Sequence, residues 1–143
     1  MSTIVNASFK FNDFLVKESH FVLNGAGEYE FELSMTPSGI VFPNQKRFQL
    51  QLEFGAVDQN GLAEIKVVAL GFFHYEDIED ISNTPFFTDN APAIVYPYIR
   101  AYISTLTAQA GIPTIILPTL NLRSMTDLLR QNISIDEQTG PKE

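Results

Sequence analysis

Residues 96–118, YPYIRAYISTLTAQAGIPTIILP, decide the fold of this chain, because they join a helix, a stop signal and a proline-bracketed linker. Apolar residues around this stretch recur at helical spacing and predict one buried helix face: Val95, Tyr98, Ile99, Tyr102, Ile103 and Leu106. The helix is predicted to run to Ala110 and to end at Gly111. The apolar linker 112–118 follows, and a second, shorter helix opens at Asn121-Leu122.

The first half of the chain carries the period-two patterns of β-strands. Residues 28–36 and 47–54 alternate apolar and polar side chains, which is typical of antiparallel strands covered on one face. Residues 65–73 are more continuously apolar, so this strand is expected to be buried on much of both faces. A turn is predicted at 58–61, where Asn-Gly is a hairpin signal. A weaker strand, 9–23, changes parity and needs a bulge near Asn12-Asp13.

The segments between these elements contain breakers or polar residues. Residues 37–45 hold two prolines and a glycine and are predicted to form a long connection, and residues 76–90 are predicted to be irregular. Asp89 or Asn90 with Pro92 indicates a helix start. Pro97 indicates either the beginning of the main helix or a kink into it.

Strands first and helices last predict an α+β fold. The expected architecture is a four-stranded antiparallel sheet with a long helix packed on one face and a short C-terminal helix. The chain has 143 residues, of which 45% are hydrophobic and 18% charged, so we expect a single domain, 1–143. The last residues, 133–143, are predicted to be a flexible, frayed tail.

The composition excludes several classes of function. A net charge of −8 and scattered Lys and Arg argue against nucleic-acid binding, which needs clustered cations. The chain has no cysteine, which excludes disulfides, Cys-bound zinc and a thiol nucleophile. Residues 1–10 lack the pattern of a signal peptide, and no apolar run approaches the length of a membrane span. We therefore expect a soluble, cytoplasmic protein without membrane insertion.

Catalytic and cofactor-binding motifs are missing from the pattern. His20 and His74 are the only histidines, and a strand-end position suits His74 better than a general-base role. Glu76-Asp77 and Glu79-Asp80 could pair or hold a cation, but their spacing matches no calcium loop and favours a solvated acidic loop. There is no phosphate loop, nucleophile elbow or zinc spacing. We expect no enzyme activity, no metal and no cofactor.

Aromatic residues are abundant for a chain of this size. Twelve phenylalanines and five tyrosines exceed what one small core obviously needs. One interpretation is a core plus an oligomer interface. The other adds an exposed apolar groove that holds extended, unfolded segments by apolar burial with little sequence specificity.

The stretch that decides the fold resembles the signature region of the SecB export chaperones, over about residues 90–129. In that family a Phe/Tyr-Pro-Tyr-x-Arg helix, here Tyr96 to Arg100, precedes a Gly-x-Pro linker, here from Gly111, and then a helix opened by Asn-Phe, here Asn121-Leu122. The resemblance implies a homotetramer, a dimer of dimers, that binds unfolded polypeptides in apolar grooves. It also implies SecA as a possible partner.

The resemblance assigns candidate site residues. A client-binding groove would be lined by Ile112, Ile115, Leu117, Leu122, Met125 and Leu129, with the linker and last helix as its mobile wall. An oligomer interface would involve Tyr96, Tyr98, Arg100 and Tyr102. Partner docking would use the acidic residues Glu18 and Asp58. Val22 stands where the family has a second acidic residue, and the connection 24–27 is shorter than the family's.

The leading hypothesis is an ATP-independent holdase chaperone, with protein export as its candidate role. The alternatives are a SecB-shaped oligomeric scaffold and a chaperone dedicated to a single partner, such as an antitoxin. Deletion of residues 121–143 separates two possibilities for the last helix. If the helix is a groove wall, the sheet survives its removal; if the helix is core, the protein unfolds.

Overall fold

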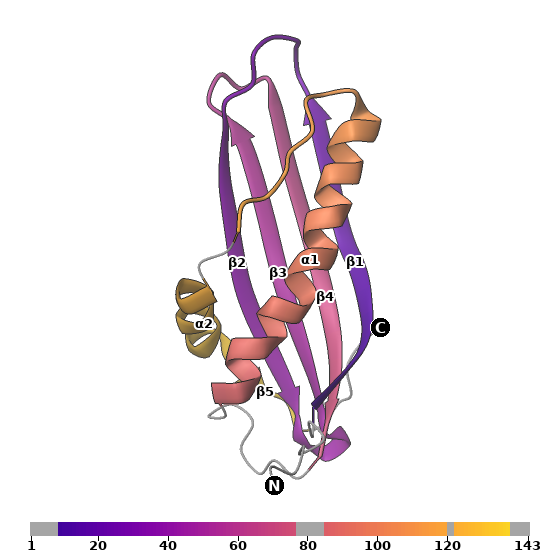
Figure 1. The fold of residues 1–143 in the computed structure, drawn as a ribbon, viewed down its shortest axis with the longest axis vertical. Helices are drawn as coiled ribbons and strands as arrows, with labels where there is room; N and C mark the ends of the chain where they lie inside the picture. The colour runs from indigo at the N-terminus through magenta and orange to yellow at the C-terminus, as the bar shows by residue number, and fades with distance from the viewer. Residues whose placement is uncertain (1–8, 77–84, 120–121, 138–143) are drawn as a thin grey trace, which may run out of the picture.

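The structure is a computed structural model, and it describes residues 9–76, 85–119 and 122–137. One antiparallel sheet with a short parallel edge has the strand order β1-β4-β3-β2-β5. The helix α1 and the linker after it cross one face of this sheet, and α2 lies beside β2 (Figure 1). The elements are β1 Phe9–Leu23, β2 Phe31–Phe42, a 3₁₀ turn Pro43–Gln45, β3 Arg47–Asp58, β4 Ala63–Tyr75, α1 Pro85–Ala110, α2 Leu122–Gln131 and β5 Ile133–Ile135. The α+β prediction is confirmed, with five strands in place of four.

The strand β1 has the predicted bounds and the predicted bulge. Its pairing with β4 shifts register between Phe11 and Asp13, and a second shift falls between Val16 and Glu18. The first shift brings Phe14 onto the same face as Phe11, because an extra residue in one strand reverses the parity of the residues after it. The side chains of Phe11, Phe14 and Val16 all pack against the core.

The strand β2 continues through residues predicted to be a connection. Pro37 pairs with Leu52 in an unbroken register with β3. Proline is tolerated at position 37 because the backbone groups of the odd-numbered residues of β2 point away from β3. Gly39 shows this direction, since its N–H donates to Asn132 O at 3.0 Å on the outer edge of β2. Pro37 therefore removes no donor from the β2–β3 ladder. Gly39 is required here, since a Cβ would lie 2.5 Å from the Phe48 ring.

The core lies between the sheet and α1. Val95, Ile99 and Ile103 of α1 are completely buried. Gly71 of β4 permits this close approach, because a Cβ there would lie 2.4 Å from Val95 Cγ2. Side chains of β4 on the opposite face, including Leu70, are also buried, as predicted for a strand covered on both faces.

The helix α1 begins at Pro85, earlier than the predicted start at Asp89 or Asn90. Pro92 and Pro97 both lie inside it, and Figure 1 shows that its lower half leans further across the sheet than its upper half. The helix ends at Ala110 as predicted, and Gly111 adopts a φ of 83°. Residues 77–84, which include Glu79-Asp80, lie outside the described residues.

The predicted frayed tail begins with a strand. Residues 133–135 form β5, parallel to residues 39–41 of β2. The Asp136 N–H donates to Val41 O at 2.8 Å, and the side chain of Ile133 packs against the core. Pairing with the edge of β2 thus orders a three-residue segment that is too short to form a strand by itself. Residues 138–143 lie outside the described residues.

Candidate functional site

Among the described residues, three hydrogen bonds with side chains of α1 hold the linker against this helix. The Ser104 hydroxyl donates to Ile115 O at 3.0 Å, and the Ile115 N–H donates to Thr107 Oγ1, also at 3.0 Å. Further along, the Tyr96 hydroxyl donates to Pro118 O. Thr107 is completely buried, and its hydroxyl donates to Ile103 O. These side chains supply polar partners to a linker that has no strand or helix ladder of its own.

The linker alternates between the core and the surface. Ile112, Ile115 and Leu117 are buried in the core, whereas Ile116 between them is 67% exposed. The first three were predicted to present apolar side chains to a client. Their burial means that most of their surface stabilises this chain, because the linker is extended and places alternate residues on opposite sides.

The helix α2 also directs its predicted groove residues inward. Met125 and Leu129 are buried and belong to the core. The side chain of Leu122 lies outside the described residues. The helix α2 thus docks on β2 and α1 through its apolar side and contributes to the core, and its role as a mobile wall of the client groove stays a prediction.

An open apolar hollow remains between β2 and the linker. It has a volume of about 160 Å³ and is lined by Leu33, Ser34, Met35, Phe54, Tyr96, Leu117 and Pro118. We call it the β2–linker groove. Leu33 is 41% exposed, and Met35 is half-buried. Of the predicted groove residues, Leu117 is the one that lines this hollow.

A second hollow lies on the other side of the linker, against α1. It has a volume of about 460 Å³, and its lining includes Arg100, Ser104, Thr114 and Ile116. Tyr96 is the one residue that lines both hollows, and it lies beneath the linker between them. Burial raises the pKa of the Tyr96 hydroxyl, and the nearby Arg100 opposes this in part. The tyrosine therefore stays neutral at physiological pH and remains a hydrogen-bond donor to the linker.

The sequence profile described as "Preprotein translocase subunit SecB" matches residues 26–132. This match covers most of the chain and both elements that build the groove. The chain belongs to the SecB family. Membership indicates a chaperone role and a non-enzymatic one.

The chain is also similar to one further sequence and to two solved structures. The chain is 30% identical, over 82% of each chain, to "Uncharacterized protein MJ0357" of Methanocaldococcus jannaschii. The fold of the present chain is similar to that of the Mycobacterium tuberculosis Rv1957 SecB-like chaperone, which was solved with a ChAD peptide from the Rv1956 HigA1 antitoxin. The TM-score is 0.67 at 20% identity, over 79% of this chain and 88% of that one. A Streptococcus agalactiae protein of unknown function gives a TM-score of 0.49 at 14% identity, over 80% and 100% of the two chains.

The residues predicted for a SecB oligomer interface fall into two groups. Tyr96 and Tyr102 are engaged within the chain, the latter by a 2.8 Å hydrogen bond from its hydroxyl to Ser19 Oγ. Tyr98 is 47% exposed and stacks on Phe14 with ring centroids 5.3 Å apart. Arg100 is exposed as well. Of the four residues, Tyr98 and Arg100 are therefore the ones that are exposed and can contact another chain.

The residues predicted to dock a partner also differ from each other. Glu18 is exposed on β1, with its carboxylate 3.9 Å from His20 Nε2. Asp58 is only 2% exposed, and its carboxylate accepts the backbone N–H groups of Glu30 at 2.6 Å and Leu62 at 2.9 Å. This placement argues against docking by Asp58 and assigns it to the β3–β4 turn.

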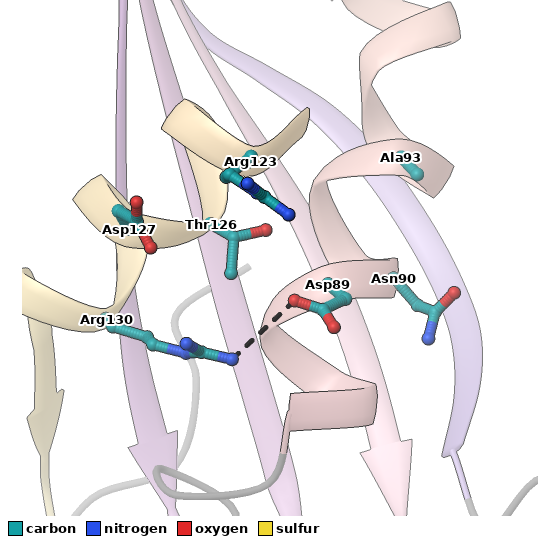
Figure 2. Close-up of a pocket in the computed structure, with 7 residues that line it drawn as sticks. All are labelled: Asp89, Asn90, Ala93, Arg123, Thr126, Asp127 and Arg130. Carbon is teal, nitrogen blue, oxygen red and sulfur yellow. Dashed lines mark ion pairs between the residues drawn. The ribbon is translucent and has the colours of Figure 1, made fainter. Parts of the chain in front are cut away.

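A third hollow lies between α1 and α2 and is lined mainly by charged and polar residues. Its volume is about 490 Å³, and two aspartates and two arginines line it, so its charge is balanced. Figure 2 shows Arg130 extending from α2 towards Asp89 of α1, and the two charged groups are 3.7 Å apart. Arg130 Nε also donates to Thr88 Oγ1 at 3.3 Å. These contacts position α2; of the residues described, no three His, Asp or Glu are grouped to hold a metal ion.

The strand residues that line the β2–linker groove were not predicted from the sequence: Leu33, Ser34, Met35 and Phe54. The alternation of apolar and polar residues in the sequence placed Leu33 and Met35 on one face of their strand and Phe54 on the inward face of the next strand. Nothing in the sequence showed which of these apolar side chains stay uncovered. Neither helix in the described part of the chain combines the length and apolar character needed to cross a bilayer.

Proposed function

We propose that this protein is an ATP-independent holdase chaperone that binds unfolded polypeptides along the β2–linker groove. One observation carries the proposal: an open apolar groove remains beside exposed Leu33 in a chain whose other core residues are closely packed. Such a groove accepts an apolar side chain of a client and gains about 25 cal/mol per Å² of apolar surface removed from water. Binding of this kind needs no nucleotide.

The groove suits extended rather than folded clients. Its volume of about 160 Å³ accommodates a side chain and not a folded surface. The second hollow offers exposed Ile116 on the other side of the linker, where a client can place a further apolar residue. Met35 supports breadth of recognition, because methionine adapts its shape to different side chains.

We propose two candidate biological roles. Protein export in the cytoplasm, with SecA as receiving partner, is in keeping with the family. A dedicated client is the second candidate, because the SecB-like relative from M. tuberculosis was solved with a peptide from an antitoxin. Exposed Glu18 on β1 is the docking residue that we retain for a basic partner.

We further propose a homotetramer, assembled as a dimer of dimers, with the outward face of α1 in an interface. That face is exposed at Tyr98 and Arg100 and carries small residues at Ala101, Thr105 and Ala108. Small side chains allow a second element to approach closely. A SecB-shaped scaffold without general client binding would share this assembly, so an assay of client binding is needed to separate the two.

Aggregation of several unrelated unfolded proteins, followed by light scattering, tests the holdase proposal. The parent protein is expected to suppress aggregation at near-stoichiometric ratios, and Leu33→Glu is expected to lose most of this activity. Val57→Glu is the matched control, because Val57 is 51% exposed on the other face of the sheet. A parent without effect on any client supports the scaffold instead.

A further inference from the structure

The polar hollow between α1 and α2 has the size of a small-molecule site. Its volume of about 490 Å³ lies within the range of ligand pockets, about 300–1,000 Å³. We call it the α1–α2 hollow, and it shares no lining residue with the β2–linker groove. Both helices contribute to its lining: Asp89, Asn90, Ala93, Arg123, Thr126, Asp127 and Arg130. Most of these side chains are charged or polar, so the hollow suits a hydrophilic occupant.

One of its two arginines is held by neighbouring side chains. Arg130 Nη2 lies 3.7 Å from Asp89 Oδ1, and Arg130 Nε donates to Thr88 Oγ1 at 3.3 Å. The charges of Arg130 and Asp89 therefore offset each other. The side chain of Asp89 is 55% exposed, and its carboxylate has acceptor positions beyond the one that faces Arg130.

The other arginine has no carboxylate partner in the described part of the chain. No ion pair joins Arg123 to an acidic residue there. Asp127 follows it by four residues on α2, a spacing at which opposite charges meet on a helix surface, yet the two do not pair. Figure 2 shows Arg123 extending from α2 towards α1, with Asp127 farther from α1. The guanidinium of Arg123 therefore offers its donors to an occupant of the hollow.

These groups define the chemistry of a ligand. A guanidinium presents a planar fork of N–H donors that matches the oxygens of a phosphate or a carboxylate. The carboxylate of Asp89 accepts hydrogen bonds from hydroxyl groups. A ligand that satisfies both carries an anionic group at one end and hydroxyl groups at the other.

We propose that the α1–α2 hollow binds a small hydroxylated organic anion, with its phosphate or carboxylate on Arg123 and a hydroxyl group on Asp89. Arg123 belongs to α2 and Asp89 to α1, so the occupant joins the two helices and stabilises the docked position of α2. The inference goes beyond the proposed function, because the hollow is separate from the β2–linker groove.

Binding of glycerol phosphate and of glycerate to the full chain tests the site. Line broadening of the ligand signals in NMR, at constant ionic strength, measures the affinity. We expect the better of the two anions to bind the parent with a Kd of about 1 mM and Arg123→Gln at least about tenfold more weakly. Lys66→Gln is the matched control, because it removes an exposed cation of β4 outside the hollow, and it should bind like the parent.

A second variant should act in the opposite direction. Asp127→Asn removes a negative charge from the lining and keeps Arg123, so the anion should bind about twofold to fivefold more tightly. The ligand should also raise the Tm of the parent and leave that of Arg123→Gln unchanged, since a ligand stabilises the state that binds it.

The outcomes separate this inference from the proposed function. Stronger binding of glycerol phosphate supports the site as one for phosphates, and stronger binding of glycerate supports it as one for carboxylates. If neither anion binds the parent, or if Arg123→Gln binds both as the parent does, the inference is wrong. Suppression of aggregation by Arg123→Gln should equal that of the parent, so the holdase proposal stands or falls on its own assay.

Discussion

Asp58 accepts backbone hydrogen bonds from both sides of a chain reversal. Its carboxylate binds the N–H groups of Glu30 and Leu62, and its backbone carbonyl accepts the Gly61 N–H at 3.0 Å. Burial alone would raise the pKa of this carboxyl group, but hydrogen bonds from the amides of Glu30, Leu62 and Asn60 outweigh it and lower the pKa below its ordinary value. The charged form is therefore favoured by folding.

The residue-scale prediction concerns acid stability. Because the pKa of Asp58 is lower in the folded chain, its contribution is present above the unfolded pKa, near 4, and is lost as the pH falls through the folded pKa. We expect Asp58→Asn to lower Tm by several degrees at pH 7 and to weaken the dependence of Tm on pH below about 4. Thermal melts across this range measure both.

The control for this prediction is Glu64→Gln, which removes an exposed carboxylate from β4. This substitution should leave unchanged both the Tm at pH 7 and the dependence of Tm on pH below about 4. If Asp58→Asn also melts like the parent at every pH, the carboxylate does not stabilise the turn, and a docking role for Asp58 regains support.

At the scale of elements, α2 is part of the core as well as a neighbour of the groove. Leu129 is completely buried, whereas Leu128 next to it is 41% exposed. We expect Leu129→Ala to lower the free energy of unfolding by about 2–5 kcal/mol, from lost burial and the cavity left behind. Leu128→Ala should change it by less than about 0.5 kcal/mol. Chemical denaturation measures both, and equal small effects would mean that α2 is a detachable wall.

The sequence pattern predicted most helices and strands, because neighbouring residues determine where these elements begin, bend and end. The strand β1 and its bulge followed from the parity change between Phe11 and Phe14, and the end of α1 followed from Gly111. The course of β2 through Pro37 did not, because proline is acceptable only where its missing N–H faces the outer edge. β5 was missed since three residues order only on a neighbouring strand edge.

At the scale of the whole molecule, the candidate site was predictable only in part. Leu117 was predicted as a groove residue, but Tyr96 was assigned to an oligomer interface, and the uncovered residues Leu33 and Met35 were assigned to no site. Which inward-facing side chains stay uncovered depends on the path of the linker across the sheet. That path is fixed by the hydrogen bonds of Thr107 and Tyr96, which join residues from different elements.

The prediction at the scale of the whole molecule concerns assembly. We expect a tetramer at micromolar concentration and smaller species for Tyr98→Ala and Arg100→Ala, because both side chains are exposed on α1 in the single chain. Gln109→Ala, exposed near the end of the same helix, should assemble like the parent. Light scattering coupled to size exclusion measures the mass. A monomeric parent, or variants that assemble and melt normally, would contradict this interface.

The central claim is that unfolded polypeptide occupies the β2–linker groove, and site-specific photocrosslinking tests it most directly. A photoreactive amino acid replaces Leu33 in the groove or, in the matched control, Val57 on the opposite face of the sheet. We predict that an unfolded client forms adducts at position 33 and few at position 57, and that the folded form of the same client forms adducts at neither. Equal labelling at both positions, or labelling at position 57 alone, would contradict the account.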